Sequence, residues 1–243
     1  IHPNNIHFCV VLIERILYDF GAADAATKAE DAKDAARRDA YVGQLPLLIE
    51  IIAECALHKS TFTTELHEKT SAIECIVWIL ETTLSAEGAL LAAIPPVPRA
   101  HDRPAPPGVF RSARVANTPN LRNLETALRE QKQCVPMVKK AAVRAIGNLV
   151  SDSGANRAAA GANGAVLLVL MCCRRVDEDE PFLMQWAIAT LRYLCLGCPE
   201  NQEILANIDS TPSGVIDRSK LLTQLGLRPE LDPETKKIKL VPL

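Results

Sequence analysis

A run of four carboxylates is the first group of residues that could do chemistry. Asp177 to Glu180 could bind a hard cation or supply a general acid and a general base. The run has no glycine for a calcium-binding turn and no histidine beside it in the sequence. It directly precedes Pro181, which suits the first turn of a helix, where negative charge is stabilising by about 0.3–1 kcal/mol. We therefore interpret the run as the start of a helix.

A second group consists of cysteines at chemically suggestive spacings. Cys195 and Cys198 form a Cys-x-x-Cys motif, and Cys172 and Cys173 precede them. Four thiolates could bind zinc, and a pair at a helix N-terminus could do redox chemistry. However, adjacent cysteines on a helix point about 100° apart, and the Cys-x-x-Cys pair falls at the end of an apolar helix pattern. We expect buried thiols here, with neither a metal nor a cofactor.

The eight cysteines together indicate a reducing compartment. They mostly lie in apolar runs such as "IIAECAL", whereas disulfide-built secreted domains place them in polar loops. We expect a cytoplasmic location. Because the chain begins with Ile1 instead of Met, targeting to an organelle through a removed segment stays open. No uncharged apolar run reaches transmembrane length. The cysteines are at positions 9, 55, 75, 134, 172, 173, 195 and 198.

No catalytic constellation is recognisable. None of the five histidines, at 2, 7, 58, 67 and 101, lies beside a plausible serine or cysteine nucleophile, and there is no glycine-rich phosphate loop. The net charge of −2 gives no reason to expect nucleic acid. Residues 99–144 carry an excess of Lys and Arg, but without interleaved aromatics. We expect neither an enzyme nor a nucleic-acid-binding protein.

Composition predicts an all-α protein, because only 4% of residues are aromatic while Ala and Leu abound. One domain over 1–243 is expected, interrupted by a charged, Ala-rich connector over 21–40 and a Pro-rich basic linker or insertion over 95–119. Because residues 21–40 lack an apolar stripe, they are either a solvated helix or a mobile connector. It ends in an extended arm or small hairpin over 227–243. Apolar periodicity predicts helices over 6–20, 45–58, 71–85, 121–133, 134–150, 165–176, 181–195, 201–208 and 217–226.

The chain also repeats itself at an offset of forty-five residues. Ala142 aligns with Ala187, Leu149 with Leu194, and Asn156 with Asn201. The segment 71–85 aligns with the same helix if the proline-rich residues are treated as an insertion. A period in the low-to-mid forties is typical of armadillo and HEAT repeats and predicts a right-handed α-solenoid. The last helix of the repeat, 182–195, is apolar on nearly all sides, which predicts burial by its own unit and the next.

The stretch "RVDEDEPFLMQWAIATLRYLCLGCPENQEI" (175–204) resembles the signature of the ataxin-10 family, an armadillo-like group. The closing "LLTQLGLRPELDPETKKIKL" is also similar to that family's C-terminal end, so the resemblance runs from Pro136 to the end of the chain. It implies a cytoplasmic, non-catalytic protein-binding scaffold with a role such as cytokinesis or signalling. The residues that carry it are Asp177, Pro181, Phe182, Trp186, Ala187, Ile188, Arg192, Leu194, Asn201, Gln202 and Ile204.

In armadillo proteins the last helix of each unit lines an inner groove, where an asparagine can hold the backbone of a bound peptide. Asn148 occupies that position, but the Trp-x-x-x-Asn ladder of nuclear-import receptors is missing, since Arg144 stands four residues earlier. We expect partner binding by Arg144, Asn148, Gln185, Arg192 and Tyr193. The alternative is that these residues make local helix–helix hydrogen bonds.

The sequence leaves the partner protein unidentified. A rival interpretation is an accessory subunit of a larger multiprotein complex, held through the 95–119 linker and the C-terminal arm.

Overall fold

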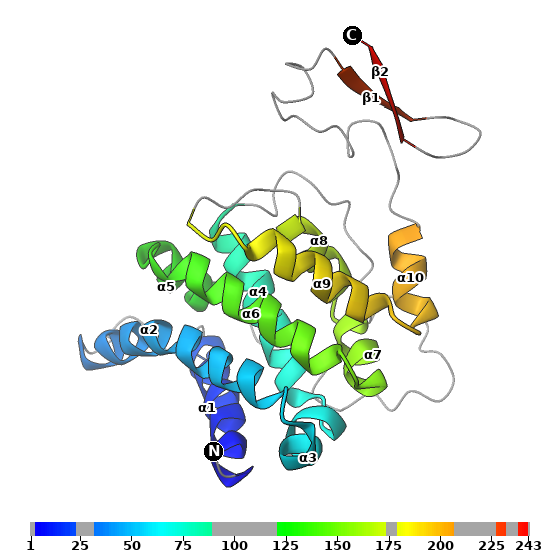
Figure 1. Ribbon diagram of the computed structural model, residues 1–243. Helices are drawn as coiled ribbons and strands as arrows, with labels where there is room; N and C mark the ends of the chain where they lie inside the picture. The colour runs from blue at the N-terminus through cyan, green and yellow to red at the C-terminus, as the bar shows by residue number, and fades with distance from the viewer. Residues whose placement is uncertain are drawn as a thin grey trace. The chain divides into compact units, whose positions relative to one another are not determined.

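A computed structural model describes residues 3–22, 32–88, 121–173, 179–206, 227–231 and 238–242 (Figure 1). These residues form ten α-helices, one π-helical segment and two strands. The chain divides into two compact units, residues 1–202 and residues 203–243. The predicted all-α class is confirmed for the first unit. The expected insertion at 95–119 and the expected helix at 217–226 lie outside the described residues.

The helices follow one another with short connections except across the undescribed segments. Their bounds are α1 Pro3–Ala22, α2 Ala32–Cys55, α3 Lys59–Phe62, η2 (the π-helical segment) Thr63–Glu68, α4 Ser71–Ala86, α5 Arg122–Glu130, α6 Cys134–Val150, α7 Gly154–Ala162, α8 Ala165–Cys173, α9 Leu183–Cys195 and α10 Pro199–Ala206.

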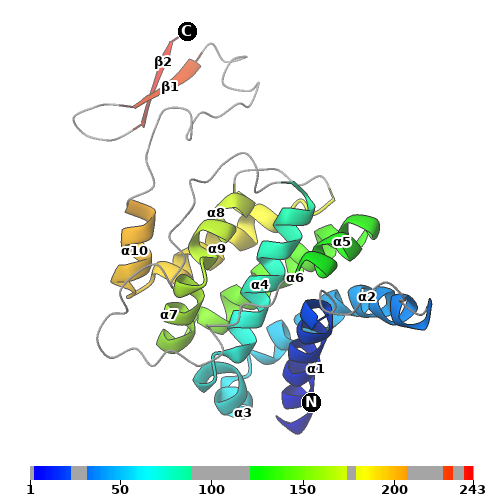
Figure 2. The ribbon, with the colours of Figure 1, turned by 180° about the vertical axis from the view of Figure 1, so that it is seen from behind.

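Two layers of helices make up the larger unit. Helices α2, α6 and α9 lie side by side at the front of Figure 1, and α1, α4 and α8 lie at the front in the reverse view of Figure 2. Helix α6 contacts α2 on one side, α9 on the other and α4 behind. Because it is covered on three sides, α6 buries most of its length, including Val138, Ile146 and Leu149. Each such buried aliphatic side chain contributes about 1.5–3 kcal/mol of transfer free energy.

Helix α2 is longer than the sequence predicts. A buried helix was predicted from residue 45, and residues 21–40, which lack an apolar stripe, were left open between a solvated helix and a mobile connector. In the structure one helix runs from Ala32 to Cys55, with Pro46 in its interior. Proline removes one backbone hydrogen bond there. Burial of Val42 and Leu45 on the N-terminal side of the proline offsets that loss. Residues 23–31 of the expected connector lie outside the described residues.

Residues 154–162 form helix α7, where apolar periodicity predicted no helix. Ser153 caps this helix by accepting a hydrogen bond from the Asn156 backbone amide at 3.2 Å. The turn between α7 and α8 is made by Asn163 and Gly164, and Gly164 has a φ of 85°. The short elements α3 and η2 were not predicted either.

The forty-five-residue repeat is visible in buried hydrogen bonds. The side-chain amide of Asn156 donates to the Leu149 carbonyl at 3.0 Å, and that of Asn201 donates to the Leu194 carbonyl at 2.8 Å. Each asparagine thus holds a carbonyl near the end of the preceding helix, α6 or α9. Both donors and both acceptors are offset by forty-five residues. Helix ends leave such carbonyls without intrahelical partners, so the bond also satisfies a group that burial would otherwise penalise.

The next residue in each unit repeats the pattern. The Arg157 guanidinium donates through Nε to the Val150 carbonyl at 2.9 Å, and the Gln202 amide donates to the Cys195 carbonyl at 2.7 Å. Again donor and acceptor are both offset by forty-five. Two consecutive side chains therefore fix the turn after α6 and the turn after α9 in the same way. The repeat that sequence comparison indicated is thus present at the level of individual hydrogen bonds.

One part of the repeat alignment is wrong. The alignment of residues 71–85 with α6 and α9 would place α4 in the front layer, but α4 lies in the other layer with α1 and α8 (Figure 2). Helix α4 contacts α6 as α8 contacts α9. Its repeat equivalent is therefore α8. Both α4 and α8 are largely buried apolar helices, and apolar composition alone does not distinguish the two layers.

The second unit contains an antiparallel pair of strands, β1 Leu227–Leu231 and β2 Ile238–Pro242. Leu227 pairs with Pro242, and Leu231 pairs with Ile238. In the sequence, the forty-five-residue period would place another equivalent of α6 and α9 at residues 228–240. At these sequence positions the described residues form strands and not a helix.

Within the described residues, no single helix combines the length and apolar composition of a membrane span. Helices α7 and α8 meet those criteria as a pair, but they are bent by 83° at the break between them.

The buried asparagine bonds generate a stability prediction. Replacing Asn201 by Ala removes the bonds to Leu194 and to the Arg157 carbonyl, and Asn201 is only 2% exposed. We expect a loss of about 1–3 kcal/mol in the free energy of unfolding, measured by urea denaturation followed by circular dichroism. The matched control is Gln202→Ala, which removes one bond of an exposed neighbour and should cost less than about 1 kcal/mol. Equal losses from the two variants would contradict the structural role of Asn201.

Candidate partner-binding surface

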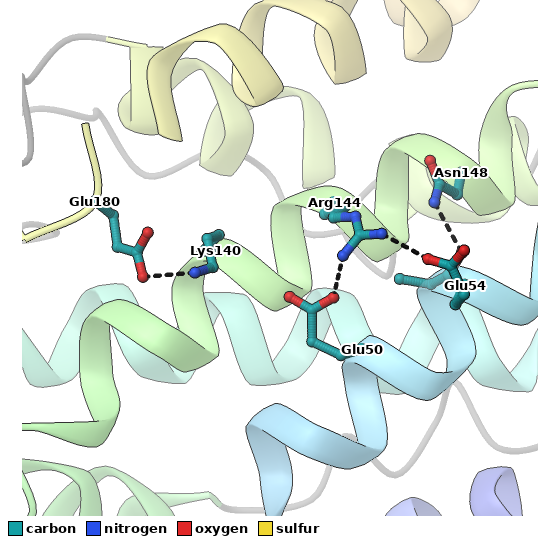
Figure 3. Close-up of polar contacts among 7 residues, drawn as sticks. Glu50, Glu54, Lys140, Arg144, Asn148 and Glu180 are labelled. Atoms are coloured by element: carbon teal, nitrogen blue, oxygen red, sulfur yellow. Dashed lines mark hydrogen bonds and ion pairs between the residues drawn. The ribbon is translucent and has the colours of Figure 1, made fainter. Parts of the chain in front are cut away.

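Arg144 connects the three helices of the front layer. It projects from α6 and forms ion pairs with two carboxylates of α2, Nη1 with Glu50 and Nη2 with Glu54 at 2.7 Å (Figure 3). Its guanidinium carbon also lies 5.7 Å from the centre of the Trp186 ring on α9, within cation–π range. A single side chain therefore contacts both neighbouring helices.

The stabilisation from this cluster is moderate, because its members are partly open to solvent. The Arg144 side chain is 26% exposed and that of Glu54 is 58% exposed. An exposed ion pair contributes about 0.2–1 kcal/mol and is screened by salt. Glu50 and Glu54 lie four residues apart on one helix face, where like charges repel. Arg144 relieves that repulsion, and the planar fork of its guanidinium suits two carboxylates better than a lysine would.

Two further side chains in the same row of α6 are also occupied within the chain. The Asn148 amide donates to the Ala53 carbonyl of α2 at 2.8 Å, and the Lys140 ammonium donates to Glu180 at 2.8 Å (Figure 3). Arg144 and Asn148 thus make helix–helix bonds, which is the alternative that the sequence left open. Their expected contact with a partner protein stays a prediction.

Helix α9 presents the remaining expected binding residues to solvent. Gln185, Arg192 and Tyr193 are all exposed. Gln185 and Tyr193 occupy the repeat positions of Lys140 and Asn148. In the amide orientation that satisfies both of its atoms, Gln185 donates to the Pro181 and Phe182 carbonyls at 3.1 Å each and supports the start of its own helix. In the described part of the chain, Arg192 contacts no carboxylate.

The expectation that α9 is buried on nearly all sides is wrong. Phe182, Trp186 and Ile188 are 66%, 41% and 55% exposed, so Trp186 is not a core anchor. The buried face of α9 is narrow and consists of Leu183, Ala187, Thr190 and Leu194. The physical reason is that α6 and α8 contact α9, while among the described residues no equivalent of α6 and α9 from a further repeat lies against it.

The contact of α9 with α6 depends on a residue pair that sequence reasoning missed. Thr190 is 1% exposed, and its hydroxyl donates to the Val143 carbonyl at 3.0 Å. A Cβ added to Gly147 would lie 2.5 Å from the Thr190 hydroxyl oxygen, so glycine is needed for this close approach. An isolated glycine within a helical pattern was the signal that could have found it.

One residue of the acidic run forms an ion pair beside this surface. Glu180 pairs with Lys140 just before α9, and Asp177 lies outside the described residues. In the described ranges no three His, Cys, Asp or Glu side chains are close enough together to hold a metal ion. The family-signature residues Asn201 and Gln202 donate hydrogen bonds to the carbonyls at the end of α9; Asn201 is buried and Gln202 is exposed.

The cysteines of the Cys-x-x-Cys motif are free thiols whose surroundings favour the protonated form. Burial raises the pKa of Cys195, and the neighbouring Cys198 raises it further. Burial also raises the pKa of Cys198, whose thiol donates to the Glu200 carboxylate at 3.4 Å. Redox-active cysteines require the opposite shift, toward a stable thiolate at neutral pH.

Comparison with known proteins identifies the C-terminal part of the chain. Residues 138–241 match the family described as "Spinocerebellar ataxia type 10 protein domain". The chain is 34% identical over 88 residues to Ataxin-10 of Xenopus tropicalis, an alignment that covers 36% of this chain and 17% of that protein. No solved structure matches significantly. The chain therefore carries an ataxin-10 family domain at residues 138–241 and is a distant homologue of Ataxin-10. The ataxin-10 family is not a known enzyme family.

The Arg144 cluster predicts measurable coupling between α6 and α2. In a double-mutant cycle of Arg144→Gln and Glu50→Gln, we expect a coupling energy of about 0.5–1 kcal/mol, falling in 1 M salt because exposed pairs are screened. Urea unfolding of the four proteins measures it. The control cycle pairs Arg144→Gln with Glu65→Gln, whose carboxylate lies near Lys69 and His7 instead. A salt-independent or absent coupling for Glu50 would contradict the ion pair.

The raised pKa values predict slow thiol chemistry at Cys195 and Cys198. A raised pKa keeps each thiol protonated to higher pH, so the thiolate fraction at pH 7–8 is below that of a free cysteine. We expect iodoacetamide to alkylate both more slowly than free cysteine at pH 7.5, with a rate that still rises beyond the pH where free cysteine levels off. Mass spectrometry of tryptic peptides follows each site. Alkylation faster than free cysteine, or stoichiometric zinc in elemental analysis, would contradict this interpretation.

Proposed function

We propose that this chain is a non-catalytic scaffold that binds a partner protein through the front layer of its helices. The larger unit is proposed to be an armadillo-like, right-handed α-solenoid. The observation that carries this proposal is the repetition of the Asn156 and Asn201 bonds at an offset of forty-five residues. Such a repeat builds an extended surface from equivalent helices, and proteins of this architecture use that surface for binding.

The two described repeats contribute differently to the proposed surface. On α6, Lys140, Arg144 and Asn148 are already bonded to other elements of the chain. On α9, the equivalent row and its neighbours are exposed, including Gln185, Arg192 and Tyr193. We therefore propose that residues of α9 make the contacts that stabilise the complex with a partner. Residues of α6 hold α9 in position against its neighbours. Arg and Tyr are enriched among the residues that dominate protein interfaces.

The setting of the proposed function follows from the same arguments. Cysteines such as Cys55 and Cys198 are buried free thiols, which is compatible with a reducing compartment and favours the cytoplasm. Roles in cytokinesis or signalling are proposed from the resemblance to the ataxin-10 family. The rival function, an accessory subunit gripped through residues 95–119 and the C-terminal arm, depends largely on residues outside the described part of the chain, so α9 carries the first test.

The proposed scaffold function is tested by quantitative affinity purification. The full chain and the double variant Gln185→Ala/Arg192→Glu are immobilised separately, and bound proteins are compared by mass spectrometry. We expect at least one protein whose recovery falls roughly ten-fold with the variant, corresponding to a loss of about 1.4 kcal/mol of binding free energy. The control is Arg15→Glu, which changes an exposed arginine on α1. Equal recovery of every bound protein with both variants would contradict binding through α9.

A further inference from the structure

The front-layer helices carry an exposed apolar residue at the same repeat position. A proline recurs at positions 46, 136 and 181, at offsets of ninety and forty-five residues. The residue after each proline is large, apolar and more than half exposed: Leu47 at 65%, Met137 at 51% and Phe182 at 66%. Single exposed apolar residues are common on protein surfaces, but these three share one position in neighbouring helices. We call these three residues the apolar ladder.

Two tertiary hydrogen bonds support this alignment of the three helices. The Ala53 carbonyl of α2 accepts from Asn148 of α6 at 2.8 Å, and the Val143 carbonyl of α6 accepts from Thr190 of α9 at 3.0 Å. Ala53 and Val143 are each the seventh residue after the proline of their helix. In Figure 1 the three helices lie side by side and run in the same direction. The ladder residues therefore follow one another across the layer.

The spacing of the ladder fits a chain in the polyproline II conformation. Helices packed against each other lie about 8–10 Å apart, which sets the distance between successive ladder residues. A polyproline II chain has three residues per turn and rises about 3.1 Å per residue, so every third side chain returns to one face after about 9.3 Å. A regular β-strand does not fit, because its third side chain points to the opposite face.

The ladder is one side chain wide, because a polar row follows it. One helical turn after the ladder, Glu50, Lys140 and Gln185 occupy equivalent positions on the three helices. Glu50 pairs with Arg144, and Lys140 pairs with Glu180. A helix laid across the layer is about 10–12 Å wide and would cover this row as well as the ladder. Burying these ion pairs would cost desolvation free energy, which an extended chain along the ladder avoids.

The charges beside the ladder select a basic partner. Glu50 and Glu54 of α2 both pair with the single guanidinium of Arg144, and the Glu54 side chain is 58% exposed. Lys140 and Glu180 balance each other. Of these five side chains three are carboxylates and two are cations, so within the described residues one negative charge at α2 lacks a counterion of its own. A lysine or arginine of the partner at this end complements it.

We infer that the apolar ladder binds a proline-rich segment of another protein in the polyproline II conformation. The segment carries an apolar residue at every third position and a basic residue at the end over α2. This inference rests on the proposed scaffold function and names the chemistry of the partner. It adds α2 and α6 to the contacts assigned to α9. A polyproline II segment is largely preformed in solution, so its binding costs little conformational entropy.

The probe is a set of fluorescently labelled synthetic peptides, whose binding to the full chain is measured by anisotropy. The first is proline-rich, with leucine at every third position and Lys at both ends. The second has Glu at both ends instead. The third has the composition of the first, but its leucines are adjacent. The fourth is helical, with Lys ends and leucine at every seventh position, which repeats about every 10.5 Å.

We expect the first peptide to bind at least ten-fold more tightly than each of the other three. Met137→Ser removes the central residue of the ladder and should weaken that binding at least ten-fold. The control Phe8→Ser removes an apolar residue of α1 that is 63% exposed, and should leave binding unchanged. Circular dichroism checks that both variants keep their helix content. Equally tight binding of any other peptide, no binding, or equal loss with both variants would overturn the inference.

The negative charge at α2 is tested separately with Glu54→Gln. This variant leaves Glu50 paired with Arg144, so the charges beside the ladder balance. The preference for Lys ends over Glu ends should then fall below two-fold. Glu68→Gln, at an exposed carboxylate of η2, is the matched control and should keep the ten-fold preference. A preference that Glu54→Gln leaves unchanged would overturn the placement of the basic residue over α2, and the inference with it.

Two further results identify other occupants of the ladder. If a second copy of the chain covers it, Met137→Ser will lower the sedimenting mass of the full chain. If another segment of the same chain covers it, none of the peptides will bind. Either result overturns the inference. If affinity purification finds an α9-dependent partner while the peptides fail, the scaffold function stands and the polyproline chemistry of the partner is wrong.

Discussion

The repeating structure depends on the carbonyl groups at the ends of α6 and α9. The last carbonyls of any helix lack intrahelical partners, and burying them without hydrogen bonds costs about 1–3 kcal/mol each. Here a buried asparagine donates to such a carbonyl from the first turn of the next unit, Asn156 to Leu149 and Asn201 to Leu194. The bond determines where the chain turns and how the next helix leaves. Equal bonds in successive units produce equal turns, which places α6 and α9 side by side.

Close contacts between repeats, one of them made by Asn201, also explain two glycines. The Asn201 side chain lies against Gly161, where an added Cβ would be 1.8 Å from its oxygen. Helix α7 therefore needs a residue without a Cβ at position 161, so that the side chain of Asn201 can pack against it. Gly147 plays a similar part between α6 and α9 by admitting Thr190. Glycine within a helix costs about 1 kcal/mol relative to alanine, and the close contacts offset that loss.

Sequence patterns predicted the elements whose signals are local. Helix α6 was predicted with its observed bounds, 134–150, because apolar periodicity is continuous there and a Ser-Asp-Ser-Gly turn follows. Helix α7 was missed because Gly154 and Gly161 resemble turn residues, although Ser153 caps the helix and Asn156 is held by tertiary bonds. The long α2 was predicted as a buried helix only from residue 45, because residues 21–40 carry no apolar stripe. Local propensity yields to tertiary contacts that no single stretch of sequence contains.

Of the candidate surface, the residue types were predictable but their environments were not. Arg144 and Asn148 were recognised as polar residues on an apolar helix, yet their bonds to Glu50, Glu54 and Ala53 join segments separated by ninety residues or more. The composition of α9 indicated burial, because eight of its thirteen residues are Leu, Met, Trp, Ile, Tyr or Cys. Whether an apolar helix is covered depends on its neighbours, and a helix at the edge of a repeat array has one neighbour fewer. In the described residues α9 is such an edge. The same aromatic side chains that would be core in a central repeat therefore stay exposed at this edge.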